Sequence, residues 1–148
     1  DLNGDSRLDL VTAGVGTSTS VLFGNGDGSF TAALSLTITG GVYALHPNIG
    51  DFNNDGYVDV LATSASGLGM FLNNGDGTFR AAITNFFGLP NAPIVGDING
   101  DGILDVVSND YTPGIQTFLI GNGDGSFAIS QTRTVAPFLR SGALGDLN

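Results

Sequence analysis

The chain of 148 residues contains no cysteine, no tryptophan, no glutamate and no lysine. The absence of cysteine excludes disulfides, thiolate catalysis and cysteine-based zinc sites. Because there is no glutamate and only one histidine, few pairs of side chains are available for general acid–base chemistry. No apolar run approaches the roughly 18 residues that a transmembrane helix needs, so no membrane insertion is expected.

The charged residues are unusual in kind. All 14 acidic residues are aspartates, all four basic residues are arginines, and the formal net charge is −10. Four scattered arginines make no basic stripe, so nucleic acid is not expected as a partner. The lack of glutamate and lysine removes good helix formers, whereas the short aspartate carboxylate suits turns and loops.

The aspartates fall into a repeated pattern. The sequence reads DLNGDSRLD from Asp1, DFNNDGYVD from Asp51 and DINGDGILD from Asp97, and DLN begins the pattern again at Asp146. A second motif, Asn-Gly-Asp-Gly-Ser/Thr-Phe, follows each complete loop at a similar distance. Successive loops start 50, 46 and 49 residues apart, and such a period is typical of repeat architectures. We expect one repeat domain over residues 1–148, with repeats of about 1–50, 51–96 and 97–145 and the start of a fourth at 146–148.

Each repeat is expected to form short antiparallel strands. Apolar residues alternate after each loop, as in LDLVTA, VDVLAT and LDVVSN, which is typical of a strand covered on both faces. The Asn-Gly-Asp-Gly turns between apolar runs predict hairpins, each followed by a strand that opens at Phe30, Phe79 or Phe127. Four short strands in about 48 residues match a β-propeller blade. The predicted fold is therefore all-β, with three four-stranded blades that are part of a closed propeller or assemble into one.

The aspartate-rich loops carry donors for a hard cation. Side-chain oxygens stand at positions 1, 3, 5 and 9, a backbone carbonyl is available at position 7, and glycine is expected at position 6. Calcium prefers six to eight such oxygen ligands, whereas magnesium demands a tighter octahedron and zinc prefers nitrogen or sulfur. We expect about three calcium ions per chain. The expected ligands are Asp1, Asn3, Asp5, Arg7 and Asp9; Asp51, Asn53, Asp55, Tyr57 and Asp59; Asp97, Asn99, Asp101, Ile103 and Asp105; and, in the incomplete fourth loop, Asp146 and Asn148.

Two other kinds of loop carry acidic residues at short, regular spacing. An EF-hand needs an acidic residue at position 12 within a helix, but Thr12, Ala62 and Ser108 stand there and a strand follows. The alternative to a metal site is that the loops are plain Asx turns in hairpins. This interpretation is weakened because the same pattern occurs three times in register. In the first loop Ser6 replaces glycine, so a strained or weaker site is expected there.

The D-x-N-x-D-G-x-x-D loop, the N-G-D-G-[ST]-F turn and the period together resemble the FG-GAP/VCBS repeats of integrin-α-type β-propellers. Similar repeats occur in bacterial extracellular proteins and in fungal lectins of the Psathyrella velutina type. The resemblance implies a structural calcium ion in the hairpin between the first two strands of each blade, and an extracellular or cell-surface location. It also places the Asn-Gly-Asp-Gly turns at the same end as the loops, where Asp27, Asp76 and Asp124 are expected to shape turns.

The segments that vary between repeats are expected on the opposite face, where ligands usually bind to a rigid scaffold. The candidate ligand-binding residues there are Tyr43, His46, Asp110, Tyr111 and Arg140, and Phe86 and Phe87 are more readily explained as packing between blades. The expected function is that of a non-catalytic recognition or adhesion module for a protein or glycan. The alternatives are a carbohydrate-binding lectin, which the absence of tryptophan disfavours, and, less favoured still, a propeller-type polysaccharide lyase.

The last segment, FLRSGALGDLN, matches the first strand of a blade and the opening of its loop. The chain thus holds three blades' worth of strands, with its final strand belonging to the next blade. Closed propellers have about four to eight blades. Either the sequence is part of a longer propeller, or copies assemble, with a homodimer completing six blades by strand exchange.

Overall fold

The computed structural model describes residues 1–14, 16, 18–31, 34–38, 45–65, 67–80, 83–85, 90–110, 114–135 and 142–145. Every regular element in these ranges is a β-strand. The described residues contain no helix that is long and apolar enough to cross a membrane. The all-β prediction is confirmed.

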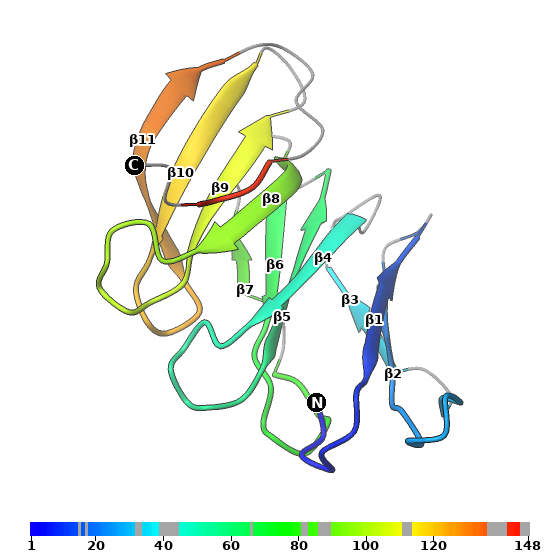
Figure 1. The fold of residues 1–148 in the computed structure, drawn as a ribbon. Helices are drawn as coiled ribbons and strands as arrows, with labels where there is room; N and C mark the ends of the chain where they lie inside the picture. Colours follow the sequence, from blue (N-terminus) through cyan, green and yellow to red (C-terminus); the bar gives the residue numbers. More distant parts are fainter. Residues whose placement is uncertain are drawn as a thin grey trace.

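The strands form three antiparallel sheets (Figure 1). Blade 1 contains β1 (Leu10–Ala13), β2 (Ser18–Leu22) and β3 (Leu34–Thr37). Blade 2 contains β4 (Leu45–Gly50), β5 (Asp59–Ser64), β6 (Gly67–Phe71) and β7 (Ile83–Asn85). Blade 3 contains β8 (Pro90–Gly96), β9 (Asp105–Asp110), β10 (Ile115–Gly121) and β11 (Phe127–Thr134). In each sheet the strands pair in chain order, which is the meander of a propeller blade.

The blades stack face to face, and the core lies between them. The cluster between blades 1 and 2 contains Leu2, Val21, Leu36, Ile38, Val60, Ala62 and Phe71. The cluster between blades 2 and 3 contains Phe52, Leu61, Leu68, Met70, Leu72, Val106, Leu119 and Phe127. Alternate residues of β5 enter different clusters, because successive side chains of a strand point to opposite faces. Blade 2 is therefore covered on both faces, and β5 is buried along its whole length.

The aspartate-rich loops and the Asn-Gly-Asp-Gly turns lie at the same end of the blades (Figure 1). The loop 51–58 joins β4 to β5, and the loop 97–104 joins β8 to β9. One detail of the prediction differs. Phe127 opens β11, whereas Phe30 and Phe79 make isolated bridges with Gly24 and Asn73, ahead of the strands that begin at Leu34 and Ile83.

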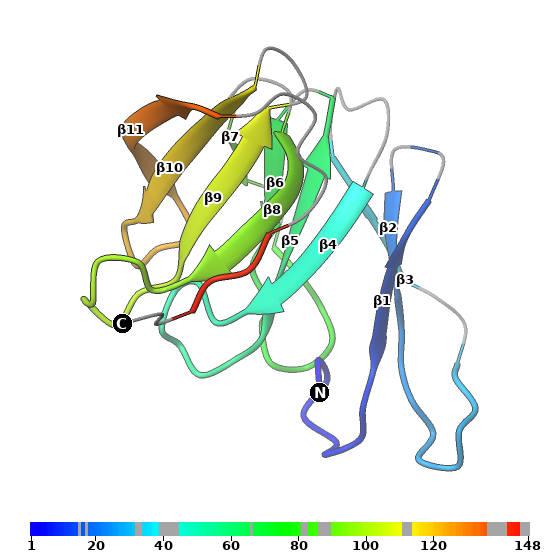
Figure 2. The ribbon, with the colours of Figure 1, turned by 45° about the horizontal axis from the view of Figure 1, so that its top comes forward.

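Residues 142–145 run beside β8 and not in the outer part of blade 3 (Figure 2). A Cβ added to Gly96 would lie 2.7 Å from the Leu144 side chain, and one added to Gly142 would lie 2.5 Å from that of Ile94. Blade 3 already has four strands. The segment therefore occupies the place of an inner strand that follows β8, as β8 follows β4.

Candidate metal-binding loops

The first seven residues of each loop fold around the aspartates at positions 1 and 5. In the loop 51–59, Asp51 Oδ2 accepts a hydrogen bond from Gly56 N at 2.9 Å, and Asp51 Oδ1 accepts one from Asp55 N at 3.2 Å. Asp55 Oδ1 in turn accepts from Tyr57 N at 3.0 Å, and Asn53 Nδ2 donates to Asp55 Oδ2 at 2.8 Å. The other two loops make the same four contacts at the matching positions. Hydrogen bonds from backbone amides to an aspartate side chain form Asx turns, which determine the conformation of such loops.

The sixth position of each loop has a left-handed backbone. Gly56 has φ of 88° and Gly102 has φ of 83°, and Ser6 adopts φ of 64°. A serine in this region is strained by contact of its Cβ with the backbone, a cost that glycine avoids. The prediction that Ser6 must adopt the conformation of a glycine is confirmed.

The aspartate at the ninth position of each loop connects three parts of the blade. Asp59 Oδ2 accepts a hydrogen bond from Phe52 N at 2.9 Å, and its Oδ1 accepts one from Asn73 N at 2.8 Å. Asp105 binds Ile98 N and Gly121 N in the same way, and Asp9 binds Leu2 N and Gly24 N. This carboxylate therefore connects the start of the loop, the start of the second strand and the outer turn.

The electrostatics of the loops differ between positions. Burial raises the pKa of the Asp59 carboxyl above its ordinary value, repulsion from Asp55 and Asp51 acts in the same direction, and the two amide hydrogen bonds oppose it. Hydrogen bonds from backbone amides, that of Gly102 foremost, lower the pKa of Asp97. Arg7 lies 3.9 Å from Asp5, and Arg80 lies 3.9 Å from Asp55. These ion pairs are partly exposed, so they offset little of the loops' negative charge.

The donors of the loops fit a calcium ion in their chemistry, because all of them are oxygens of carboxylates, amides and carbonyls. Asp51 Oδ2 and Asp55 Oδ1 each accept one amide hydrogen bond, which leaves a second lone pair on each of these oxygens. In the present geometry, no group of three or more acidic or histidine side chains among the described residues is gathered closely enough to hold a metal ion. Asp146 and Asn148 lie outside the described residues.

The aspartates of the outer turns serve the turn itself. Asp27, Asp76 and Asp124 each accept hydrogen bonds from the amide and the hydroxyl of the serine or threonine two residues later, at 2.5–2.9 Å. The hydroxyl contact is the main reason that the pKa of each of these carboxyls lies below its ordinary value. This agrees with the expectation that these residues shape turns.

Asn73 connects blade 1 to blade 2, a role that the sequence pattern did not predict. Its Nδ2 donates to the carbonyl of Leu2 at 2.8 Å and to that of Val58 at 3.0 Å, and its Oδ1 accepts from Gly75 N at 2.9 Å. The residue is buried, with 1% of its surface exposed. One feature of the sequence distinguishes this position, because the other two repeats have glycine here, at positions 24 and 121.

Two candidate ligand residues at the opposite end are described. His46 is exposed and lies at an irregularity of β4, with φ of 46°, and Ala92 has φ of 42° at the matching irregularity of β8. Asp110 is half-buried at the end of β9. The other candidates, Tyr43, Phe86, Phe87, Tyr111 and Arg140, lie outside the described residues.

Antiparallel blades whose first two strands are joined by aspartate-rich loops define a β-propeller repeat protein. The FG-GAP-like repeat family matches residues 1–62 and 51–108, so the chain belongs to this family. Comparison with curated proteins gives no match. Among solved structures, the chain is similar to an Agrocybe aegerita lectin that specifically recognises non-reducing terminal N-acetylglucosamine. The identity is 27% and the TM-score 0.63, and the match covers 95% of this chain but 38% of the lectin chain.

Proposed function

We propose that the chain is a calcium-binding β-propeller module of an extracellular or cell-surface protein, and that it recognises a ligand without catalysis. The observation that carries the calcium proposal is that three loops capture backbone amides in the same way with an all-oxygen donor set. The residues that would hold the ions are those at positions 1, 3, 5, 7 and 9 of each loop. A divalent cation there would offset the mutual repulsion of the three aspartates in each loop.

Calcium is expected to contribute substantially to folding. Extracellular modules bind calcium at roughly 10⁻⁴–10⁻³ M, and a ligand at 100 times its dissociation constant stabilises the folded state by about 2.7 kcal/mol. Three ions would change the formal charge from −10 to −4, because 3 × (+2) = +6. Thermal unfolding is to be measured in calcium and in chelator. An unchanged midpoint would contradict the proposal.

A pair of matched variants assigns the ions to the loops. Asp55→Asn removes one carboxylate from the second loop, whereas Asp76→Asn makes the same change in an adjacent turn whose carboxylate serves its own hydroxyl partner. Calorimetric titration should show about three ions in the unchanged chain and in Asp76→Asn, and one fewer or a much weaker ion in Asp55→Asn. Equal effects of the two variants would mean that the loops are not the binding sites.

The likeness to a lectin favours a glycan as the ligand, on the face opposite the calcium loops. An array that contains glycans with terminal N-acetylglucosamine is the direct test. His46→Ala is a suitable variant because Ala92 already occupies the matching position with a similar φ, so the fold should be retained. Asp27→Asn, at the loop end, is its control. Binding that both variants leave unchanged would place the glycan elsewhere, and an array with no binding would favour a protein ligand.

A further inference from the structure

The outer turn of blade 2 (residues 73–78) lies between the aspartate-rich loops of blades 1 and 2, as Figure 1 and Figure 2 both show. On one side, a Cβ added to Gly77 would lie 3.1 Å from the Cβ of Asn3 in the first loop. On the other side, a Cβ added to Gly75 would lie 2.5 Å from Cζ of Tyr57 in the second loop. The turn therefore contacts the loop of its own blade and also the loop of the preceding blade.

The side chain of Asn73 bonds one peptide group in each of these two loops. Its Nδ2 donates to the carbonyl of Leu2 at 2.8 Å and to that of Val58 at 3.0 Å. The first carbonyl belongs to the peptide group that joins Leu2 to Asn3, and the second to the one that joins Val58 to Asp59. Asn3 and Asp59 are both expected calcium ligands. One side-chain amide thus holds the peptide group directly before a ligand in two different loops.

Both peptide groups are fixed by more than this one bond. The N–H of the peptide group between Leu2 and Asn3 donates to Asp1 Oδ1 at 3.2 Å, so this group is held at both its amide and its carbonyl. In the second loop, the backbone amide of Asn73 donates to Asp59 Oδ1 at 2.8 Å. Residue 73 therefore holds the Asp59 carboxylate as well as the carbonyl that precedes it.

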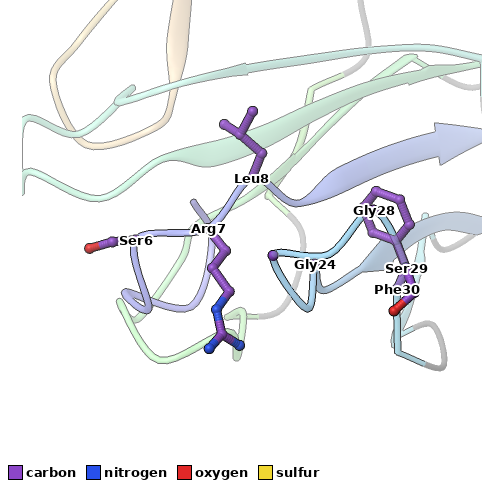
Figure 3. Close-up of a pocket in the computed structure, with 8 residues that line it drawn as sticks. Ser6, Arg7, Leu8, Gly24, Gly28, Ser29 and Phe30 are labelled. Atoms are coloured by element: carbon purple, nitrogen blue, oxygen red, sulfur yellow. The ribbon is translucent and has the colours of Figure 1, made fainter.

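The other two blades have no side chain at this position, because Gly24 and Gly121 stand where blade 2 has Asn73. A Cβ added to Gly24 would clash with the carbonyl of Leu8, and one added to Gly121 would clash with that of Leu104. Figure 3 shows Leu8 and Gly24 side by side in blade 1, where both line a surface recess. The bridging amide is therefore particular to blade 2.

The loop of blade 3 provides a reference within the same chain. It makes the same internal hydrogen bonds as the other two loops. Blade 3 contacts the loop of blade 2 through apolar groups, since the Phe127 ring meets that of Phe52 edge to face, with centroids 6.0 Å apart. Because Gly121 has no side chain, residue 121 cannot join the loops of blades 2 and 3 as Asn73 joins those of blades 1 and 2.

We propose that Asn73 is a positioning residue for two calcium sites, those in the loops of blades 1 and 2, and not for the site in the loop of blade 3. This inference rests on the proposed calcium function. Asn73 fixes the peptide groups before Asn3 and Asp59, so these ligands need less ordering when an ion binds. Loss of a partner that orients a metal ligand typically lowers metal affinity by about 10- to 100-fold.

Each loop is to be measured separately with terbium(III), a cation that takes oxygen ligands as calcium does and luminesces when a tyrosine beside it is excited. Tyr57 already stands at position 7 of the second loop. Arg7 and Ile103 stand at the same position, each 3.3 Å from a Cβ added to the matching turn glycine, Gly26 or Gly123. Arg7→Tyr or Ile103→Tyr, each combined with Tyr57→Phe, therefore moves the reporter to the first or the third loop. Tyr57→Phe alone is the blank, because the chain has two other tyrosines.

Asn73→Gly gives blade 2 the residue that the other two blades have here. In the three reporter chains it should weaken terbium binding, and calcium competition, by about 10-fold or more in the loops of blades 1 and 2, and leave the loop of blade 3 unchanged. Asn73→Ala removes the same side-chain bonds without adding backbone freedom and should give the same pattern. Asp76→Asn is the control in the same turn, because its carboxylate bonds the amide and hydroxyl of Thr78, and it should leave all three loops nearly unchanged.

The outcomes separate this inference from the calcium proposal itself. A general loss of stability would weaken all three ions equally, and that result would overturn the positioning role of Asn73. Unchanged binding in the loops of blades 1 and 2 would overturn it too, while leaving the calcium function intact. An unchanged chain whose loops bind neither terbium nor calcium would overturn the calcium function and this inference together.

Discussion

Replacing Asn73 with alanine should destabilise the chain by about 3 kcal/mol. The side chain donates to the carbonyls of Leu2 and Val58 and accepts from the amide of Gly75, and it is 1% exposed. Each hydrogen bond contributes about 1 kcal/mol net, and the buried bond to Leu2 is not replaced by a bond to water. At this chain length 1 kcal/mol corresponds to about 2–4 °C, so the thermal midpoint should fall by about 6–12 °C.

Asn74→Ala is the control for this prediction. Asn74 is the next residue, is exposed, and donates to the Thr78 hydroxyl at 2.9 Å. Its replacement should change stability by about 0.5 kcal/mol or less, as is usual at the surface. Both variants are to be unfolded by heat under calorimetry, in chelator and in calcium. If the two midpoints shift equally, Asn73 does not connect blades 1 and 2 in the way described.

Three further substitutions test packing and backbone. Thr19→Val should raise the free energy of unfolding by about 1 kcal/mol in a denaturant titration, because the buried Thr19 hydroxyl has no partner among the described residues. A loss of stability would mean that the hydroxyl does have a hydrogen-bond partner. Ser6→Gly should remove about 1 kcal/mol of backbone strain, because Ser6 has a left-handed φ of 64°. Calorimetry should then show tighter calcium binding in the first loop alone, and weaker binding would refute the strain argument. Gly77→Ala should cost about 1–3 kcal/mol more in chemical denaturation than Gly102→Ala, because both have similar positive φ but only the first meets Phe23, and equal costs would contradict this.

The fold was largely predictable because its signals are local and repeated. The Asn-Gly-Asp-Gly turns and the alternating apolar residues predicted hairpins of four strands, and blades 2 and 3 have them. The alignment of Ser6 with Gly56 and Gly102 predicted its positive φ, because the three loops make the same hydrogen bonds. Repetition supplied evidence that one loop alone does not contain.

The contacts between blades were harder to predict. The side chain of Asn73 binds a carbonyl 71 residues away, and no local pattern specifies which blade face will meet it. Thr19 is a polar residue in the apolar pattern of β2, and its repeat equivalent in β6 is Leu68. The sequence does not show whether such a residue is buried without a hydrogen-bond partner. Phe30 and Phe79 were expected to open strands, yet each makes only an isolated bridge.

The aspartate at the ninth position of each loop bears on the order in which the chain folds. Asp59 reaches amides 7 and 14 residues away, and Asp105 reaches amides 7 and 16 residues away. Closing such short segments costs little chain entropy, so each hairpin can form early and independently. The contact of Asn73 with Leu2, across 71 residues, requires two formed blades. Variants at Asp59 should therefore slow folding, whereas variants at Asn73 should mainly speed unfolding.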